Sequence, residues 1–153
     1  MKDGLKISRR KLPHWELGGS VYFITFSSIT GALPDEALRI VLETIKYDHN
    51  RKYRLYIALA MPDHVHLIIQ PLIKEENKCF TLSEILKAIK GISSWRINRL
   101  LGKSGQVWMA ESYDRIIRSE KDFIEKWNYI LINPVKSGLI ESTEDWEFVF
   151  IPD

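Results

Sequence analysis

The stretch "MPDHVHLIIQP" (residues 61–71) holds two histidines one residue apart, although the chain has only 4 histidines among 153 residues. Successive side chains of a β-strand point to opposite faces, so alternate residues share a face. His64 and His66 should therefore project side by side. The other face should carry the core-forming side chains of Val65, Leu67 and Ile69. This stretch predicts a buried strand that presents two imidazoles together.

The patterns on either side of this strand predict the fold. The run at 21–28 is rich in β-branched and aromatic residues, the pattern at 33–50 is helical, and 53–60 is again strand-like. Pro62 and Asp63 predict the turn of a hairpin that joins 53–60 to 64–70.

The second half of the chain predicts a long helix at 81–105, with Gly91 as a possible bend, and a short strand at 113–119. A last helix at 119–133 should be capped by Ser119 and stopped by Pro134. The order β-α-β-β-α-β-α predicts an α+β protein, with a ferredoxin-like (RRM-like) antiparallel sheet and helices packed on it.

Length and composition are those of one ordinary globular domain, with 45% hydrophobic and 27% charged residues over 1–153. The domain divides into a basic N-terminal arm (about 1–18), a core (about 20–140) and a short acidic tail (about 141–153). One cysteine excludes an internal disulfide framework and a cysteine-based zinc cluster. No apolar run predicts a membrane span or a signal peptide, so we expect a cytoplasmic protein with no membrane partner.

The last predicted helix carries a second unusual pair. An apolar stripe should dock it on the sheet, formed by Phe123, Ile124, Trp127, Ile130 and Leu131. Tyr129 and Asn133 are four residues apart and share a different face. Taken alone, such a tyrosine is usually a surface residue, and a His-x-His strand is often a pair of partly buried imidazoles.

Taken together, the two pairs predict more. Two neutral imidazoles on one face can chelate a divalent metal, and an amide oxygen from Asn133 could complete the ligand set. Tyr129 would then lie beside the metal. A metal with open positions and a hydroxyl nucleophile are the parts needed for phosphodiester chemistry.

These residues also resemble a known family. "PDHVHLIIQP" is similar to the HUH (His-hydrophobic-His) motif of the single-tyrosine, IS200-like transposases. "YILINPVKSGLI" (residues 129–140) resembles the tyrosine segment of their REP-associated branch, the REP-associated tyrosine transposases. The intervening basic, Trp-containing segment at 86–118 resembles the same branch, so the likeness runs from about residue 21 to 140.

The resemblance implies a central position for the histidine strand, a metal (Mg²⁺ or Mn²⁺) on His64 and His66, and Tyr129 as the nucleophile. Asn133 falls where many relatives have a glutamine as third metal ligand. The implied substrate is single-stranded DNA that folds into a hairpin of palindromic repeats. The implied reaction cleaves and rejoins DNA through a 5′-phosphotyrosine intermediate, by a monomer or a homodimer whose tyrosine serves its own or its partner's site.

Basic side chains expected around this site are candidates for contacts with DNA phosphates. They are Arg9, Arg10 and Lys11 of the arm, Lys90, Arg96 and Arg99 of the long helix, and Lys136.

Two other functions fit parts of the pattern. A histidine-triad nucleotide hydrolase is disfavoured because Ile68 occupies the place of a third alternating histidine. A non-catalytic module that binds single-stranded DNA or RNA stays open, because rings of Tyr22, Phe23 or Tyr56 could stack on bases.

Overall fold

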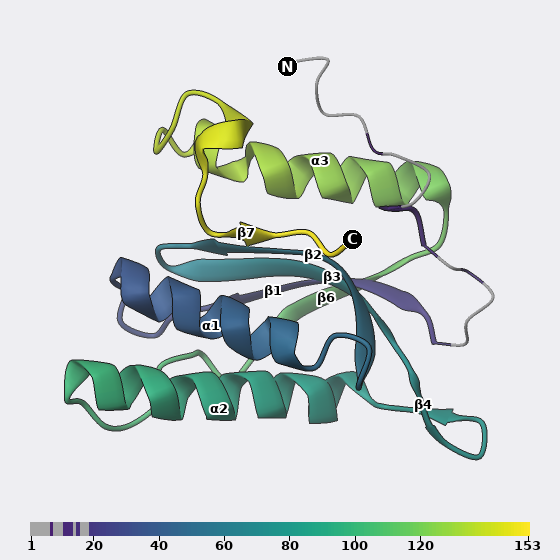
Figure 1. Ribbon diagram of the computed structural model, residues 1–153, viewed down its shortest axis with the longest axis horizontal. Helices are drawn as coiled ribbons and strands as arrows, with labels where there is room; N and C mark the ends of the chain where they lie inside the picture. Colours follow the sequence, from purple (N-terminus) through teal and green to yellow (C-terminus); the bar gives the residue numbers. More distant parts are fainter. Residues whose placement is uncertain (1–6, 8–10, 14, 16–18) are drawn as a thin grey trace.

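The computed structural model describes residues 7, 11–13, 15 and 19–153. Its centre is a sheet in the order β6-β1-β3-β2-β7, in which every neighbouring pair is antiparallel (Figure 1). The strands are β1 (Val21–Ser27), β2 (Tyr53–Met61), β3 (His64–Pro71), β6 (Tyr113–Ile117) and β7 (Val149–Phe150). The helices are α1 (Asp35–Tyr47), α2 (Leu82–Leu101) and α3 (Glu120–Lys136).

The order β1-α1-β2-β3-α2-β6 is the ferredoxin-like arrangement that the sequence predicts. The histidine strand β3 lies in the middle of the sheet, between β1 and β2. In this register His66 faces Thr25 of β1 on one side and Leu59 of β2 on the other. The α+β fold and the central position of β3 are therefore confirmed.

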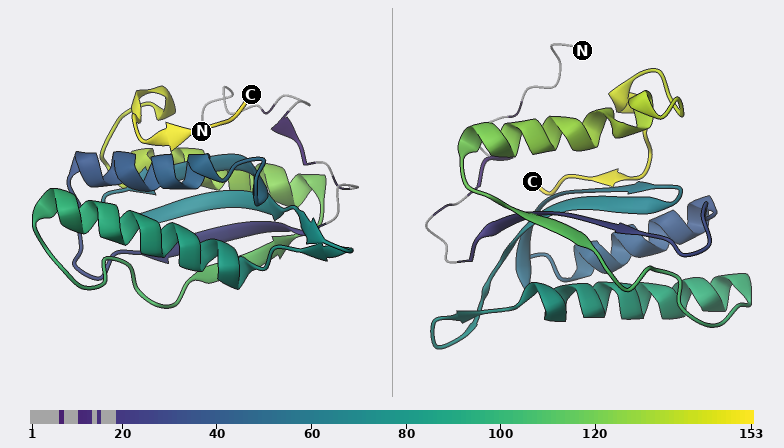
Figure 2. Two further views of the ribbon diagram at one scale, coloured as in Figure 1. Left: turned by 60° about the horizontal axis from the view of Figure 1, so that its bottom comes forward. Right: turned by 180° about the vertical axis from the view of Figure 1, so that it is seen from behind.

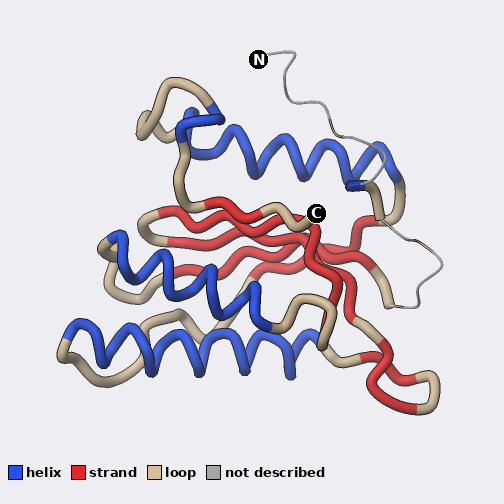
Figure 3. Tube along the Cα trace, viewed as in Figure 1, coloured by secondary structure: helices blue, strands red, loops and turns tan. Residues whose placement is uncertain are grey.

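Helices cover both faces of the sheet (Figures 1 and 2). α1 and α2 lie on one face, over a core that contains Val65, Leu67 and Ile69 of β3. α3 lies on the other face, over a second core that contains Ile68 of the same strand. The alternation expected along β3 is thus confirmed, and His64 and His66 belong to the α3 face. The secondary-structure view in Figure 3 shows the same three layers.

The tube in Figure 3 also shows α3 as one unbroken helix. Ser119 caps it as predicted, by accepting a hydrogen bond from the amide of Asp122 at 3.1 Å. The prediction that Pro134 stops the helix is wrong, because α3 continues to Lys136. A proline loses only one amide donor so near a helix end, and Pro134 is buried with Phe123, Trp127 and Ile130. The amide of Ser137 still bonds the carbonyl of Asn133 at 3.0 Å, which completes the final turn.

The acidic tail contributes to the sheet and to the core. A 3-10 turn (Thr143–Asp145) leads into β7, which pairs with β2 at Ala58 and Leu59. The indole of Trp146 donates a hydrogen bond to the carbonyl of Ala60 at 3.0 Å. The tail thereby covers part of an edge of β2 that would otherwise be open to pairing with another strand.

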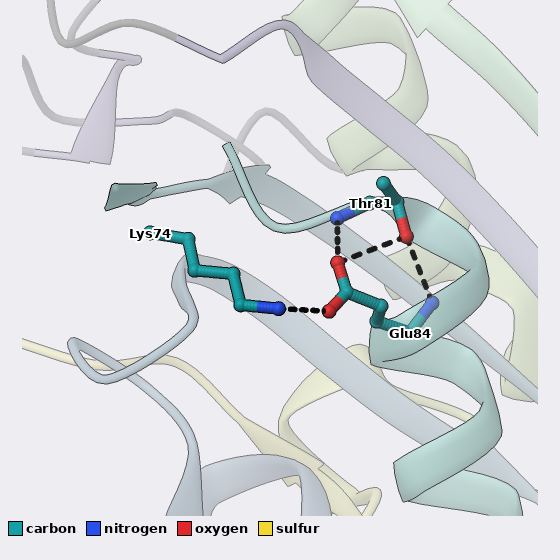
Figure 4. A network of polar contacts seen from close by, with 3 residues as sticks. All are labelled: Lys74, Thr81 and Glu84. Carbon is teal, nitrogen blue, oxygen red and sulfur yellow. Dashed lines mark hydrogen bonds and ion pairs between the residues drawn. The ribbon is translucent and has the colours of Figure 1, made fainter. Parts of the chain in front are cut away.

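A small hairpin connects β3 to α2, built from β4 (Ile73–Glu75) and β5 (Lys78–Cys79). It is held to the start of α2 by the network in Figure 4. Lys74 binds the Glu84 carboxylate at 2.7 Å, and that carboxylate accepts the Thr81 amide at 2.9 Å. The Thr81 hydroxyl accepts the Glu84 amide at 3.1 Å, which completes a capping box. In the part of the chain that the structure describes, no helix has the length and apolar character needed to cross a membrane.

We expect Glu84→Gln to destabilise the protein at neutral pH. The bond from Lys74, followed by the Thr81 amide, lowers the pKa of Glu84 from 4.5 to about 2. A carboxylate whose pKa is lower in the folded protein than in the unfolded chain stabilises the fold at pH values above the unfolded-state pKa. This stabilisation is lost as the pH falls toward the folded-state pKa. Urea titrations should show that the free energy of unfolding is higher for wild type than for the variant at pH 7. This difference should become smaller as the pH falls from 4.5 to 2. Thr81→Ala, which removes the cap itself, should lower the free energy of unfolding by about 1 kcal/mol. A difference between wild type and Glu84→Gln that does not depend on pH would contradict the role of the charge.

Candidate active site

His66 is the buried member of the histidine pair. It lies in the middle of the sheet, and only 3% of it is exposed. Its Nδ1 shares a hydrogen bond of 2.7 Å with the hydroxyl of Thr25 on β1. Its Nε2 is buried and has no hydrogen-bond partner in the described structure. A buried polar atom left without a partner is costly in a folded protein, so this nitrogen is a candidate for binding a ligand or a water molecule.

The surroundings of His66 keep its imidazole neutral. Burial, followed by the proximity of His64, lowers the pKa of His66 to about 3. A neutral imidazole offers a nitrogen lone pair, which is what a divalent metal requires.

His64 is more accessible and is oriented by its neighbour. Its side chain is 24% exposed, and its Nδ1 lies 2.7 Å from a carboxylate oxygen of Asp63. A carboxylate on one ring nitrogen favours metal binding through the other nitrogen. The two imidazole rings are 4.7 Å apart between centroids. Each Nδ1 is thus held by an oxygen atom, which makes the Nε2 of each ring the candidate metal-binding nitrogen.

Tyr129 lies on α3 and contacts His66 of the histidine pair. Its ring is edge-on to His66 at 5.5 Å and to Phe23 at 5.9 Å between centroids, and 45% of the residue is exposed. The ring therefore lies beside His66 of its own chain. A pocket of about 560 Å³ opens here, lined by Phe23, Thr25, His66, Tyr113, Glu125, Lys126 and Tyr129.

The direction of α3 relates Asn133 to the histidines. Phe123 contacts Tyr56, which bonds Gln70 near the end of β3, whereas Tyr129 contacts His66. α3 therefore runs toward the His64 end of the strand, and its next turn carries Asn133 in that direction. None of the described contacts joins the Asn133 side chain to either histidine.

A metal at this site would need a ligand set of mixed type. Among the described residues, no group of three or more His, Cys, Asp or Glu side chains could hold a metal ion. The two imidazoles must therefore be completed by a neutral side-chain oxygen or by oxygens of water or substrate. The unpartnered Nε2 of His66 is of the donor type that a divalent transition-metal cation accepts.

Lys126 and Tyr113 line the pocket, but sequence reasoning did not select them. Lys126 precedes Tyr129 by three residues, a spacing that places both on neighbouring turns of a helix. Its side chain is only 18% exposed and pairs with Asp122 at 3.0 Å. Tyr113 pairs with Thr25 across β6 and β1, and Thr25 pairs with His66, so the three share one face. The helical spacing of Lys126 was visible in the sequence, whereas the position of Tyr113 depends on strand order.

The predicted phosphate-binding residues are spread over the molecule. Arg9 and Arg10 lie outside the described residues. Lys11 donates a hydrogen bond to the carbonyl of Pro152, so this member of the arm contacts the acidic tail. Lys136 is exposed in the last turn of α3, seven residues after Tyr129 and therefore on the same side of that helix.

The expectation that the α2 bases gather around the histidines is wrong. α2 packs on the face of the sheet opposite to α3, because its apolar side chains belong to the core with α1. The ammonium of Lys90 donates to the carbonyls of Met109 and Ala110 at 2.9 and 3.1 Å, and burial lowers its pKa. Arg96 pairs with Glu43 at 2.8 Å, and Arg99 lies over the Trp95 ring at 4.9 Å. Their contact with DNA stays a prediction, now for a second surface.

The rings considered for an open-faced binding module are not available as a platform. Tyr56 is 3% exposed and Phe23 is 5% exposed, because α3 covers that face of the sheet. Tyr22 packs partly against the core on the other face. Ile68, in the place of a third histidine, is fully buried.

Comparisons with known proteins agree with the motif. A REP-associated tyrosine transposase of Escherichia coli is 25% identical over 104 residues, which is 68% of this chain and 58% of that protein. A Haemophilus influenzae protein, provisionally given the same name, is 27% identical over 93 residues, 58% of this chain and 53% of its own length. The matches thus span little more than half the length of these curated relatives. No family model matches the chain.

The fold has a counterpart among solved structures. The structure of a REP-associated tyrosine transposase bound to a REP hairpin superposes with a TM-score of 0.68 at 23% identity, over 94% of this chain and 81% of that one. This likeness concerns the fold alone, whereas the two relatives described above are similar in sequence. The chain is therefore related, in sequence and in fold, to the REP-associated tyrosine transposases.

Proposed function

We propose that this protein cleaves and rejoins single-stranded DNA next to hairpins, with Tyr129 as the nucleophile. The observation that carries the proposal is the contact between Tyr129 and His66, whose Nε2 is buried without a partner. A half-exposed tyrosine beside a candidate metal ligand would supply the nucleophile and the Lewis acid that phosphodiester transfer uses.

His64 and His66 would hold a Mg²⁺ or Mn²⁺ ion, with Asn133 as third protein ligand. Two nitrogen ligands suit Mn²⁺, whereas Mg²⁺ prefers oxygen. When bound, the ion would act as a Lewis acid on the scissile phosphate. Thr25 and Asp63 orient the two rings, since each holds an Nδ1 atom at 2.7 Å.

In the proposed reaction the Tyr129 hydroxyl attacks the phosphorus and loses its proton. The bond between phosphorus and the 3′ oxygen breaks, and that oxygen leaves as a 3′-hydroxyl after it gains a proton. The product is a 5′-phosphotyrosine link, so the phosphodiester is conserved. Attack by a 3′-hydroxyl on this link reverses the chemistry and rejoins a strand. The contact between Tyr129 and His66 of the same chain supports a reaction in which the tyrosine serves the site of its own chain.

The Lys126 ammonium supports this chemistry by stabilising negative charge at Tyr129 and on the phosphate. We expect Lys126→Met to slow adduct formation on the order of a hundred-fold, with hairpin affinity much less affected. Lys126→Arg should restore part of the rate because it keeps the charge. Quench-flow assays of the covalent product would measure the rates, and an unchanged rate in Lys126→Met would rule out this role.

The DNA-binding part of the proposal predicts a strong dependence on salt. If Lys136 contacts a phosphate, Lys136→Ala should lower the slope of log affinity against log salt by roughly 0.7, the value for one contact with a single strand. Lys52 is a suitable control, because it pairs with Asp48 at 3.6 Å at the start of β2. Fluorescence anisotropy with a labelled hairpin gives both slopes. An equal slope in wild type and Lys136→Ala would remove Lys136 from the interface.

The experiment that tests the proposed function is a search for the covalent intermediate. The protein is incubated with Mn²⁺ and labelled single-stranded oligonucleotides that carry palindromes from the DNA flanking its gene. On a denaturing gel, the label should move to protein mass and resist boiling in detergent. Binding without an adduct on any such hairpin would favour the alternative, a non-catalytic single-strand-binding module.

A further inference from the structure

The pocket beside Tyr129 has more aromatic surface than the reaction needs. Tyr113 and Tyr129 each stand edge-on to Phe23, at 6.2 and 5.9 Å between centroids and at interplanar angles of 73° and 78°. Tyr113 is 55% exposed and Tyr129 is 45% exposed, whereas Phe23 is nearly buried. The planes of both tyrosine rings are thus steeply inclined to the plane of the Phe23 ring.

The position of Tyr113 is set by the edge strand β6. Tyr113, Thr25 and His66 are consecutive partners across β6, β1 and β3. The Tyr113 ring is therefore two strands away from the histidine, within the same pocket of about 560 Å³. The Tyr113 ring contacts Phe23 edge-on, and 55% of the residue is exposed, so much of its surface is accessible to a ligand.

We infer that this pocket binds one unpaired nucleobase of the DNA strand, next to the phosphate that Tyr129 attacks, by stacking on Tyr113. The inference rests on the proposed function and extends it to the substrate. A flat aromatic ligand suits a pocket that is lined by Phe23, Tyr113 and Tyr129, and stacking is tolerant of base identity. Glu125 and Lys126 also line the pocket, so a hydrogen-bond acceptor and a donor are within it.

This arrangement explains how a covered sheet can still contact bases. α3 buries Phe23 and Tyr56 in the core on its face, whereas Tyr113 on the edge strand β6 remains 55% exposed. A base held there would fix the position of the strand relative to Tyr129. Such positioning is a large part of catalysis in phosphoryl transfer.

The test measures the coupling between Tyr113 and one base. The probes are hairpin oligonucleotides with a single abasic site, moved through each position around the cleaved bond. Tyr113→Val removes the ring but keeps a residue that favours strands, and Tyr113→Phe keeps the ring. At one position, the abasic site should weaken binding to wild type roughly ten-fold. Tyr113→Val should bind intact DNA that much more weakly and show no further loss with the abasic probe.

Controls separate this inference from the proposed function. Tyr113→Phe should bind like wild type, and Tyr47→Ala, which removes an exposed ring on α1 that is 66% exposed, should show the full abasic effect. Independent, additive losses in Tyr113→Val would overturn the stacking role, as would unchanged binding. Failure of the proposed function would give a different result. Wild type would then form no adduct, but the fluorescent base analogue 2-aminopurine, placed at the same position, would still report stacking on Tyr113. If wild type forms the adduct and no abasic position is coupled to Tyr113, the proposed base stacking on Tyr113 is wrong and the proposed function stands.

Discussion

Tyr129→Phe should form no covalent DNA adduct, a loss on the order of a thousand-fold or more, while it binds the hairpin with nearly wild-type affinity. The large effect follows from the loss of the nucleophile, for which no other group compensates directly. The small effect on binding follows from the structure, because the ring contacts with Phe23 and His66 remain and only the hydroxyl is removed. The same protein samples should be compared on denaturing gels and by anisotropy.

The position of the adduct provides a sharper check. Tyr113 lines the same pocket and is the more exposed of the two tyrosines, at 55% against 45%. Mass spectrometry of proteolytic fragments should place the nucleotide on Tyr129. An adduct that persists in Tyr129→Phe, or that maps to Tyr113, would falsify the assignment of the nucleophile.

His64→Ala and His66→Ala should each lose Mn²⁺ binding and adduct formation, but they should differ in stability. His66 is 3% exposed and is the partner of the Thr25 hydroxyl, so its loss leaves a cavity and an unpaired polar group. We expect His66→Ala to destabilise the fold by about 1–3 kcal/mol. The side chain of His64 is 24% exposed, so His64→Ala should be close to wild type in stability.

Calorimetric titration with Mn²⁺, together with urea denaturation, separates these effects. The His64→Ala variant decides the metal assignment. If this variant is folded and does not bind Mn²⁺, unfolding cannot explain the loss of binding. Asn133→Ala should weaken Mn²⁺ binding less, because an amide oxygen is a neutral ligand that water can replace. Wild-type Mn²⁺ affinity in both histidine variants would show that the pair is structural.

Local patterns were sufficient for several parts of the site. Side-chain alternation predicted that His64 and His66 share a face, because the period of a strand depends only on the backbone. The cap at Ser119 and the stripe of Phe123, Trp127 and Ile130 are equally local, since they repeat with the helical period. The extent of α3 was predicted less well, because buried packing of Pro134 outweighed the usual effect of a proline.

The sequence by itself determined the three helices, the strands β1, β2, β3 and β6 in their ferredoxin-like order, and the two imidazoles and the tyrosine as candidate partners. Only the tertiary structure decided that α3 lies over the histidine face, that α2 takes the opposite face with its bases, and that Tyr113 and Lys126 enter the pocket. It also turned the unassigned acidic tail into an edge strand against β2. The physical reason is that periodicity reports which side chains share a face of one element. Which faces then meet depends on strand order and on packing between residues far apart in the chain, such as Tyr113, Thr25 and His66.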